Sequence, residues 1–343
     1  MKAIDLRSDT VTLPSNEIKD SIFNSKLGDD VFQEDPTVNE LEKKAAQLSG
    51  KDSALLVPSG TMGNLVSFLV HCARGTEAIL GDKSHTFIYE AGGISAFGGI
   101  HSNQVKNQSD GTIDLNDIKN SIRQDNIHFP VTSLISLENT HNKCHGYPIE
   151  KSYIDQVADI AKENKIKLHI DGARIFNAAV ELNIDLSDLV ENVDSLTFCL
   201  SKGLACPIGS VICGSEEFIA SARRIRKALG GGMRQAGIIA AAGLSSLKGF
   251  KSQIIIDHKN AQLLSHGISQ IDGLEIDLDK IKTNIVYFKL VNDSISSSQF
   301  LKNCEKENIL FFETSPDEYR MVTHYGITKN DIEFVLDKMR EIV

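Results

Sequence analysis

The feature of this sequence that most constrains its fold is an alternation between short apolar runs and longer amphipathic ones. Six apolar runs have the length of buried strands, at residues 53–58, 77–80, 133–137, 167–170, 195–199 and 209–213. Between several of them, apolar side chains recur at helical spacing, over residues 63–72, 152–163 and 216–228. Because strands joined through helices pair in parallel, the pattern predicts an α/β fold with a mostly parallel central sheet flanked by helices.

The end of the chain has a different pattern, in which short strands and helices are mixed. Helical spacing covers residues 254–270, 298–307 and 329–342, and strand-like runs cover residues 284–290, 309–312 and 319–324. A chain of 343 residues is long enough for one large or two modest domains. We therefore predict a large domain over residues 1–248 and a small C-terminal α+β domain over residues 249–343.

Charge and composition exclude several classes of partner. The chain has 36 Lys and Arg against 46 Asp and Glu, a formal net charge of −10, so bulk charge will not attract nucleic acid or an anionic membrane. No apolar run approaches the roughly 18 residues of a membrane-spanning helix. The charged start disfavours a signal peptide, and the six cysteines form no CxxC pair. We expect a cytoplasmic protein with reduced thiols, acting on a small molecule.

A lysine follows one of the predicted strands directly. Ser201 and Lys202 come immediately after Leu200, at the carboxyl end of an apolar run, where open α/β sheets bind ligands. Lying between Leu200 and Leu204, the amine is expected to be partly desolvated. A neutral amine can form a Schiff base with an aldehyde cofactor. The same spacing also fits a surface lysine at the start of a loop.

An aspartate occupies the corresponding position after another strand. Asp171 ends the run 167–170, and Arg174 follows three residues later. A carboxylate there can pair with the protonated pyridine nitrogen of pyridoxal phosphate (PLP), which this cofactor needs to act as an electron sink. Taken alone, Asp171 also fits a helix N-cap and Arg174 a surface salt bridge.

The turn PSGTMGN, residues 58–64, joins a predicted strand to a predicted helix. Free backbone N–H groups at a helix start, with the hydroxyls of Ser59 and Thr61, suit a phosphate group. The turn is neither a Walker loop nor a dinucleotide fingerprint. An ordinary strand-to-helix turn is the alternative.

Loop histidines and scattered arginines complete the candidate set. His85 and His128 lie in loops, where a histidine can stack on an aromatic cofactor or act as a base near neutral pH, although most loop histidines do neither. Arg320, in a predicted strand, suits a substrate carboxylate. No cluster of metal ligands stands out, so we predict no metal site.

Long motifs then give the sequence a family resemblance. They are IDLRSDTVT, GDDVFQEDPTVNELE, PSGTMGN, HTFIYEAGG, DNIHFP, LENTHN, HIDGARIFNAAV, CLSKGLACPIGS, GGGMRQAG and YRMVTH. In these motifs the chain resembles the low-specificity L-threonine aldolases, which belong to the aspartate aminotransferase-like (fold type I) PLP enzymes. The resemblance implies a fold type I large domain and PLP-dependent cleavage of L-threonine or L-allo-threonine to glycine and acetaldehyde.

The resemblance also implies cofactor-binding roles for matching residues. Lys202 would form the Schiff base and Asp171 would pair with the pyridine nitrogen. His85 would stack over the ring and is a candidate base. The residues that would surround the phosphate and the lysine are Ser59, Gly60, Thr61 and Ser201.

Substrate and subunit contacts are implied in the same way. Ser8, Arg174 and Arg320 would bind the substrate carboxylate, with Arg174 also beside the cofactor and residues 1–14 reaching the active site. His128 would approach the substrate hydroxyl. Arg234 would reach the phosphate of a neighbouring subunit, which implies a homo-oligomer, a tetramer of two dimers with active sites at the subunit interface.

Two departures from the family pattern bear on substrate preference. Phe32 stands where the family usually has Tyr, followed by Gln33 instead of Gly, and the segment after LENTHN reads KCHGYPIE. A β-eliminating lyase or racemase of the same fold would share Lys202 and Asp171 and is the alternative function. A catalytically silent homologue is a further alternative, which the filled chemical positions disfavour.

Overall fold

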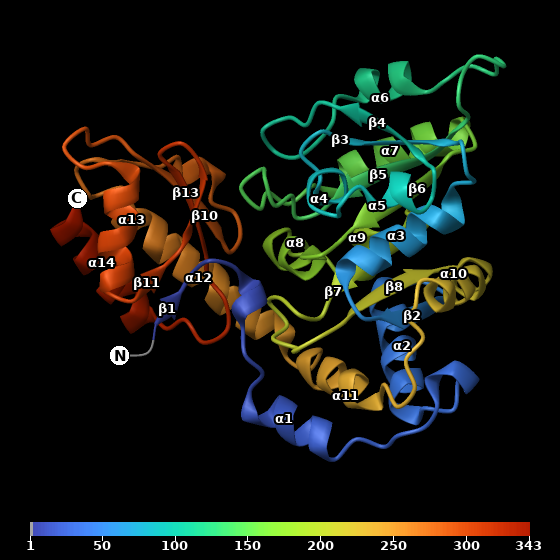
Figure 1. The fold of residues 1–343 in the computed structure, drawn as a ribbon, viewed down its shortest axis with the longest axis horizontal. Coiled ribbons are helices and arrows are strands. Elements are labelled where there is room, and N and C mark those ends of the chain that lie inside the picture. The colour runs from blue at the N-terminus through green and yellow to red at the C-terminus, as the bar shows by residue number, and fades with distance from the viewer. Residues whose placement is uncertain (1–2) are drawn as a thin grey trace.

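A seven-stranded sheet forms the centre of the computed structural model, which describes residues 3–343 (Figure 1). All strands are parallel except β8, which runs antiparallel to both neighbours, so the predicted α/β fold is confirmed. In sheet order the strands are β2 (Ser53–Val57), β8 (Ser210–Gly214), β7 (Ser195–Cys199), β6 (Lys167–Asp171), β5 (Thr132–Glu138), β3 (Glu77–Gly81) and β4 (His101–Val105).

Helices cover both faces of this sheet because its strands carry apolar side chains on both faces. Leu55 and Val57 of β2 pack in a cluster with α3 and α10, whereas Ala54 and Leu56 pack in the larger cluster with α2. The helices around the sheet are α1 (Asn16–Phe23), α2 (Pro36–Ser49), α3 (Gly60–His71), α4 (His85–Ile88), α5 (Gly93–Ala96), α6 (Leu115–Ser121), α7 (Lys151–Glu163), α8 (Ile175–Glu181), α9 (Leu186–Leu189), α10 (Glu216–Ala228) and α11 (Gly237–Ser246). Two short 3₁₀ helices, η1 (Asp9–Val11) and η2 (Asp30–Phe32), precede α1 and α2.

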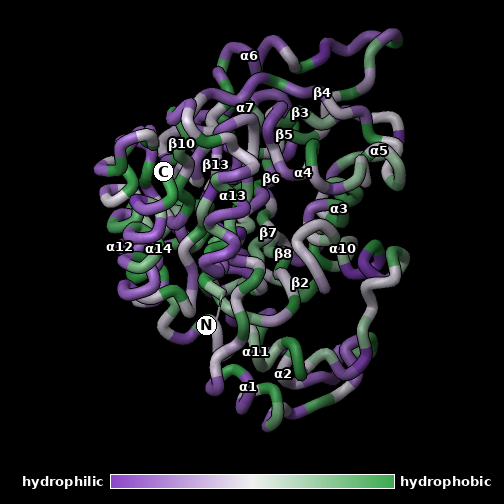
Figure 2. The backbone as a smooth tube through the Cα atoms, turned by 60° about the vertical axis from the view of Figure 1, so that its left-hand side comes forward, coloured by the Kyte–Doolittle hydropathy of each residue, from purple (hydrophilic) through white to green (hydrophobic). Residues whose placement is uncertain are grey.

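The C-terminal residues form a second, antiparallel sheet. Its order is β12 (Phe312–Ser315), β13 (Glu318–Val322), β10 (Ile285–Leu290) and β9 (Leu274–Glu275). The helices beside it are α12 (Phe250–Ile268), α13 (Ser297–Lys306) and α14 (Lys329–Ile342), with the 3₁₀ helix η3 at Leu278–Lys280. Figure 2 shows α12 and α14 with hydrophilic and hydrophobic bands, as amphipathic helices require.

The N-terminal segment joins these two parts of the molecule. Strand β1 (Ile4–Asp5) pairs in parallel with β11 (Ile309–Leu310), and Ile4 and Leu6 lie in the C-terminal apolar core. The chain then passes to the edge of the large sheet. The division at residues 248/249 stays a prediction; the link between α11 and α12 there includes Gly249 in the left-handed region, with φ 72°. None of the helices within residues 3–343 has the length and hydropathy to cross a membrane.

We expect Leu6→Ala to lower the free energy of unfolding by about 2–5 kcal/mol, because Leu6 is fully buried and its removal leaves a cavity. Leu13→Ala is the matched control, since Leu13 is 71% exposed, and its effect should stay within about 0.5 kcal/mol. Urea unfolding of both variants measures the difference. Equal stabilities would mean that the N-terminal segment is not anchored in the C-terminal core.

Candidate active site

The strand ends of the large sheet meet at one edge. Val57 and Cys199, the last residues of β2 and β7, both pair with Ser210 of β8. Glu138 and Asp171, the last residues of β5 and β6, pair with each other. Side chains that follow these strands therefore gather at the carboxyl edge, where α/β sheets bind ligands.

Lys202 lies three residues beyond β7 and is partly exposed. Its positive charge acts on both Asp9 and His85, lowering the pKa of the Asp9 carboxyl and opposing the net upward shift of the His85 pKa. No hydrogen bond fixes its Nζ to another residue in the part of the chain that the structure describes.

Asp171 is held in place by the side-chain amide of Asn64, which lies on α3. Asn64 of α3 donates from Nδ2 to Asp171 Oδ2 over 2.9 Å, and the backbone N–H of Ala173 donates to Oδ1 over 3.1 Å. Thr197 Oγ1 donates to Asn64 Oδ1 over 2.6 Å, which orients the amide. The carboxylate is 4% exposed, so these donors replace the water that would otherwise solvate it.

His85 stands at the start of α4, between two glutamates. Its Nδ1 lies 2.9 Å from Glu90 Oε1, and its backbone N–H donates to Glu138 Oε2 over 2.6 Å. Burial would lower the pKa of His85, but the hydrogen bond to Glu90 and the negative charge of Asp171 outweigh it and raise the pKa. Burial and the charge of Asp171 also raise the pKa of Glu90.

The turn that opens α3 is pressed against the sheet. A Cβ on Gly60 would lie 2.8 Å from Cys199 Sγ, so only glycine fits there. Ser59 caps the helix by accepting the N–H of Met62 over 3.2 Å. Within residues 3–343, no acceptor receives the backbone N–H groups of Gly60 and Thr61, and both hydroxyls of the turn reach solvent. This is a donor set for a phosphate.

Arg174 is already engaged by an acidic partner. Its Nε and Nη2 donate to the two carboxylate oxygens of Asp9 over 2.6 and 2.7 Å, and both side chains are buried. Burial would raise the pKa of Asp9, but Arg174 and the charge of Lys202 lower it to about 2. Nη1 is the part of the guanidinium left for an anion. The hydroxyl of Ser8 lies beside this pair and donates to Asp9 Oδ1 over 3.3 Å.

Arg320 of β13 reaches the site from the C-terminal sheet. Its Nη1 donates to Asn142 Oδ1 over 3.0 Å and its Nη2 to the carbonyl of Arg7 over 2.9 Å. Its buried Nε has no partner within the described residues. The backbone N–H of Asn142 donates to Glu138 Oε1 over 2.9 Å, so Glu138 connects Arg320 to His85.

Two predicted site residues are not joined by hydrogen bonds to this group of side chains. His128 is exposed in the loop before β5, at the amino end of a strand whose carboxyl end carries Glu138. Arg234 is exposed after α10, where its Nη1 donates to Asp29 Oδ2 over 2.9 Å. Neither shares a hydrogen bond with Lys202, Asp171 or His85 among residues 3–343.

Sequence reasoning assigned no role to several residues of the site. Asn64, Glu90, Glu138 and Asn142 all lie inside the quoted motifs, yet only their contacts show what they do. Glu138 could have been predicted from the sequence, since it is an acidic residue at the carboxyl end of a predicted strand, as Asp171 is.

His85, Glu90 and Asp171 place ligand atoms within 4.8 Å of one another, a spacing that a metal ion could bridge. The amide of Asn64 lies between the two carboxylates, however, and donates to both over 2.8 and 2.9 Å. The carboxylates are therefore engaged by N–H donors, and we assign no metal to them.

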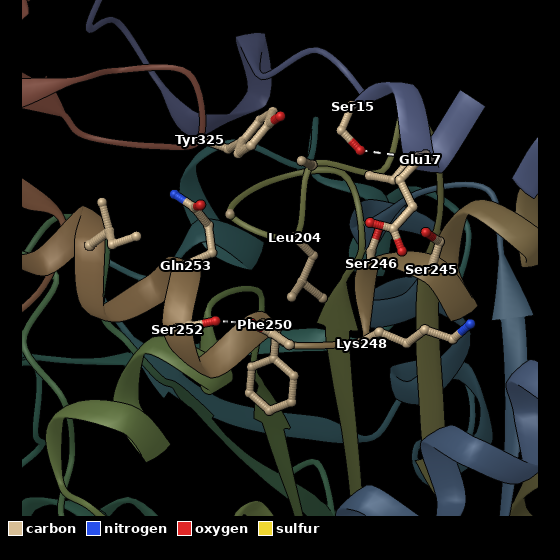
Figure 3. Close-up of a pocket in the computed structure, with 15 residues that line it drawn as sticks. Ser15, Glu17, Leu204, Ser245, Ser246, Lys248, Phe250, Ser252, Gln253 and Tyr325 are labelled. Carbon is tan, nitrogen blue, oxygen red and sulfur yellow. Dashed lines mark hydrogen bonds between the residues drawn. The ribbon is translucent and has the colours of Figure 1, made fainter. Parts of the chain in front are cut away.

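A separate cavity borders the loop that follows Lys202 (Figure 3). Leu204, Gln253 and Tyr325 line it, together with Ser15 at the start of α1. Lys202, Asp171 and His85 are not among its lining residues. The cavity therefore lies beside the loop that follows Lys202 and does not include these three side chains.

Comparisons with known proteins agree with this geometry. The model of the family described as beta-eliminating lyase matches residues 5–290. The chain is 44% identical to a probable low-specificity L-threonine aldolase 2 of Arabidopsis thaliana, over 100% of this chain and 98% of the relative. It is 39% identical to the low specificity L-threonine aldolase of Escherichia coli (strain K12), over 96% of each chain.

Solved structures share the fold at low sequence identity. A putative aromatic amino acid beta-eliminating lyase/threonine aldolase from Exiguobacterium sp. superposes with a TM-score of 0.84 at 18% identity, over 100% of this chain and 98% of the other. The threonine aldolase of Leishmania major gives a TM-score of 0.81 at 17% identity, over 98% of each chain.

We expect Asp9→Asn to lower the free energy of unfolding by about 3–5 kcal/mol at neutral pH, because it leaves Arg174 buried without a counter-charge. The pKa of Asp9 is depressed to about 2 from 3.8, so its contribution is complete above pH 4 and is lost as the pH falls through 2. The stability difference should therefore shrink over that window.

The control is Asp5→Asn, in a more exposed pair with Arg7, which should lower the free energy of unfolding by about 1 kcal/mol or less. Urea unfolding between pH 2 and 7 checks both; a difference that does not change with pH would contradict the pairing.

Proposed function

The chain belongs to the beta-eliminating lyase family, and on this basis we propose that it cleaves L-threonine and L-allo-threonine to glycine and acetaldehyde. It is a PLP-dependent lyase of the low-specificity L-threonine aldolase type. The observation that carries the proposal is the convergence of Lys202, Asp171 and His85 at one edge of the sheet, beside the donor turn of α3.

The residues at this edge fit PLP group by group. Lys202 offers an amine for the aldehyde, and the buried carboxylate of Asp171 suits a protonated pyridine nitrogen. The free N–H groups of Gly60 and Thr61, with the hydroxyl of Ser59, suit the phosphate, and Ser201 adjoins the lysine. When bound, the cofactor supplies an electron sink for the pair released as Cα–Cβ breaks.

Substrate binding falls to the arginines and Ser8. Arg320, whose charge is matched by no carboxylate within residues 3–343, and Nη1 of Arg174, which the bonds to Asp9 leave unused, would face the substrate carboxylate, and the Ser8 hydroxyl is close to Arg174 through Asp9. Fixing the carboxylate at these points fixes the orientation of the Cα–Cβ bond relative to His85. His85 accepts the β-hydroxyl proton, directly or through a water, while the C=O of acetaldehyde forms and Cα–Cβ breaks.

A second function, β-elimination from a small amino acid or its racemisation, is favoured by the family description beta-eliminating lyase. Lys202 and Asp171 would serve either reaction. Products separate the functions, because an aldolase releases glycine and an aldehyde without ammonia, whereas β-elimination releases ammonia. A racemase would only interconvert enantiomers.

We also propose a homotetramer of two dimers with active sites at subunit interfaces. Exposed apolar side chains support an interface: Phe23 is 88% and Ile127 98% exposed. His128 lies beside Ile127, at the far edge of its own sheet, so it would serve the site of another subunit. Arg234 would do the same for a partner's phosphate. The six buried free cysteines support a reducing, cytoplasmic location.

Lys202→Ala should abolish threonine cleavage and remove the visible absorbance of lysine-bound cofactor, because no other amine takes its place. Absorption spectra and product analysis for glycine, acetaldehyde and ammonia provide the measurements. Lys162→Ala, an exposed lysine of α7, is the control and should match wild type. A wild-type-like spectrum in the Lys202 variant would show that another residue holds the cofactor.

If His128 acts in a neighbouring site, inactive Lys202→Ala and His128→Asn chains should restore each other. A mixed dimer holds one site with an intact Lys202 and a partner's His128, so equal co-expression should recover about a quarter of wild-type activity. Specific activity of the purified mixture is the measurement. Activity no higher than that of the separate variants would place His128 outside the neighbouring site.

A further inference from the structure

We propose that Glu90 is a positioning residue that keeps a proton on His85 Nδ1 and so makes Nε2 the nitrogen that accepts the substrate's proton. The proposal deepens the function proposed above and rests on it for the identity of the substrate. The Glu90–His85 pair itself is a property of this chain and can be tested separately.

The hydrogen bonds around Glu90 assign the proton. Glu90 Oε1 accepts the Nδ2–H of Asn64 over 2.8 Å and lies 2.9 Å from His85 Nδ1. Because Thr197 already donates to Asn64 Oδ1, the amide nitrogen must face the carboxylates. Glu90 Oε1 therefore acts as an acceptor, and Nδ1 of His85 is the protonated donor.

Burial makes this contact strong. Glu90 is 5% exposed and shares the amide of Asn64 with Asp171, so two carboxylates stand close together away from water. A buried carboxylate is costly unless it is paired and hydrogen-bonded. The Nδ1 proton of His85 meets that need, and Glu90 in turn holds the ring, as a carboxylate orients the histidine in other carboxylate–histidine pairs.

Charges reach His85 from every element packed against it. Glu90 and Asp171 stabilise the protonated ring, Lys202 opposes it, and Glu138 binds the backbone N–H. Burial alone would lower the pKa of His85, and the Glu90 hydrogen bond is the largest of the contributions that raise it. Removing the Glu90 charge should therefore weaken the ring as a base.

The other ring nitrogen has no partner in the protein. His85 Nε2 makes no hydrogen bond within residues 3–343, the side chain is 34% exposed, and Nε2 is not a buried atom. The phenol ring of Tyr89 lies beside the imidazole, with centroids 5.5 Å apart and a 44° tilt. Nε2 is thus the atom that takes the β-hydroxyl proton, whose O–H electron pair becomes the second bond of the acetaldehyde carbonyl.

The test compares Glu90→Gln with Glu163→Gln, which removes an exposed carboxylate of α7 and leaves the site untouched. NMR of ¹³C-histidine-labelled holoenzyme follows the titration of His85, assigned with a His85→Asn variant. We expect the titration midpoint of His85 to move to lower pH in Glu90→Gln and to stay at the wild-type value in Glu163→Gln.

Kinetics supply the second readout. In Glu90→Gln, kcat for threonine cleavage should fall about 10- to 100-fold with a smaller change in KM, the size of effect expected for a residue that orients a reacting histidine. The acidic limb of the plot of kcat against pH should move to lower pH, because a histidine that is a weaker base stays unprotonated at lower pH. Glu90→Asp keeps the charge and should recover part of both.

An unchanged His85 titration in Glu90→Gln would overturn the proposal. A second result would also overturn it: kcat falls in Glu90→Gln, the acidic limb of the pH profile does not move, and Glu90→Asp does not restore kcat. That result would show that Glu90 acts only through packing. If wild-type enzyme releases no glycine and acetaldehyde from threonine, the proposed function fails, whereas the NMR comparison still decides the Glu90–His85 pair.

Discussion

The amide of Asn64 is the contact on which the site depends. It stands between Glu90 and Asp171 and donates to both, while Thr197 fixes its orientation. Without it, the two buried carboxylates would face each other with no N–H donor between them, an arrangement that burial and like charge both disfavour. With it, Asp171 can pair with a pyridinium while Glu90 accepts the hydrogen bond of His85. One amide therefore lets two neighbouring carboxylates bind different partners.

A second carboxylate joins the two parts of the chain. Glu138 binds the backbone N–H of His85 through one oxygen and that of Asn142 through the other. Asn142 then accepts from Arg320 of the C-terminal sheet and, through its carbonyl, from Tyr287. Hydrogen bonds that cross from one sheet to the other therefore link His85 to Arg320.

Sequence patterns predict those parts of the molecule that burial dictates. β7 and α10 begin and end where apolar periodicity places them, because both are packed against the core. The sequence pattern did not predict β4, because it is an edge strand with largely polar, partly exposed residues and no apolar run. Lys202 and Asp171 were proposed as site residues because strand ends mark ligand sites. Asn64 and Glu90 were not, since their roles arise from contacts between residues far apart in the sequence.

The positive charge that the site offers to an anion depends on which of its arginines already pair with a carboxylate of the protein. Arg174 is paired with Asp9 on both oxygens, so most of its charge is matched inside the protein. Within residues 3–343, Arg320 donates to the amide oxygen of Asn142 and the carbonyl of Arg7, which orient it but carry no formal charge. In a chain with a net charge of −10, an arginine held this way keeps its positive charge for an incoming anion. On the proposed function, Arg174 would organise the site and both arginines would hold the carboxylate, with Arg320 supplying the unmatched charge.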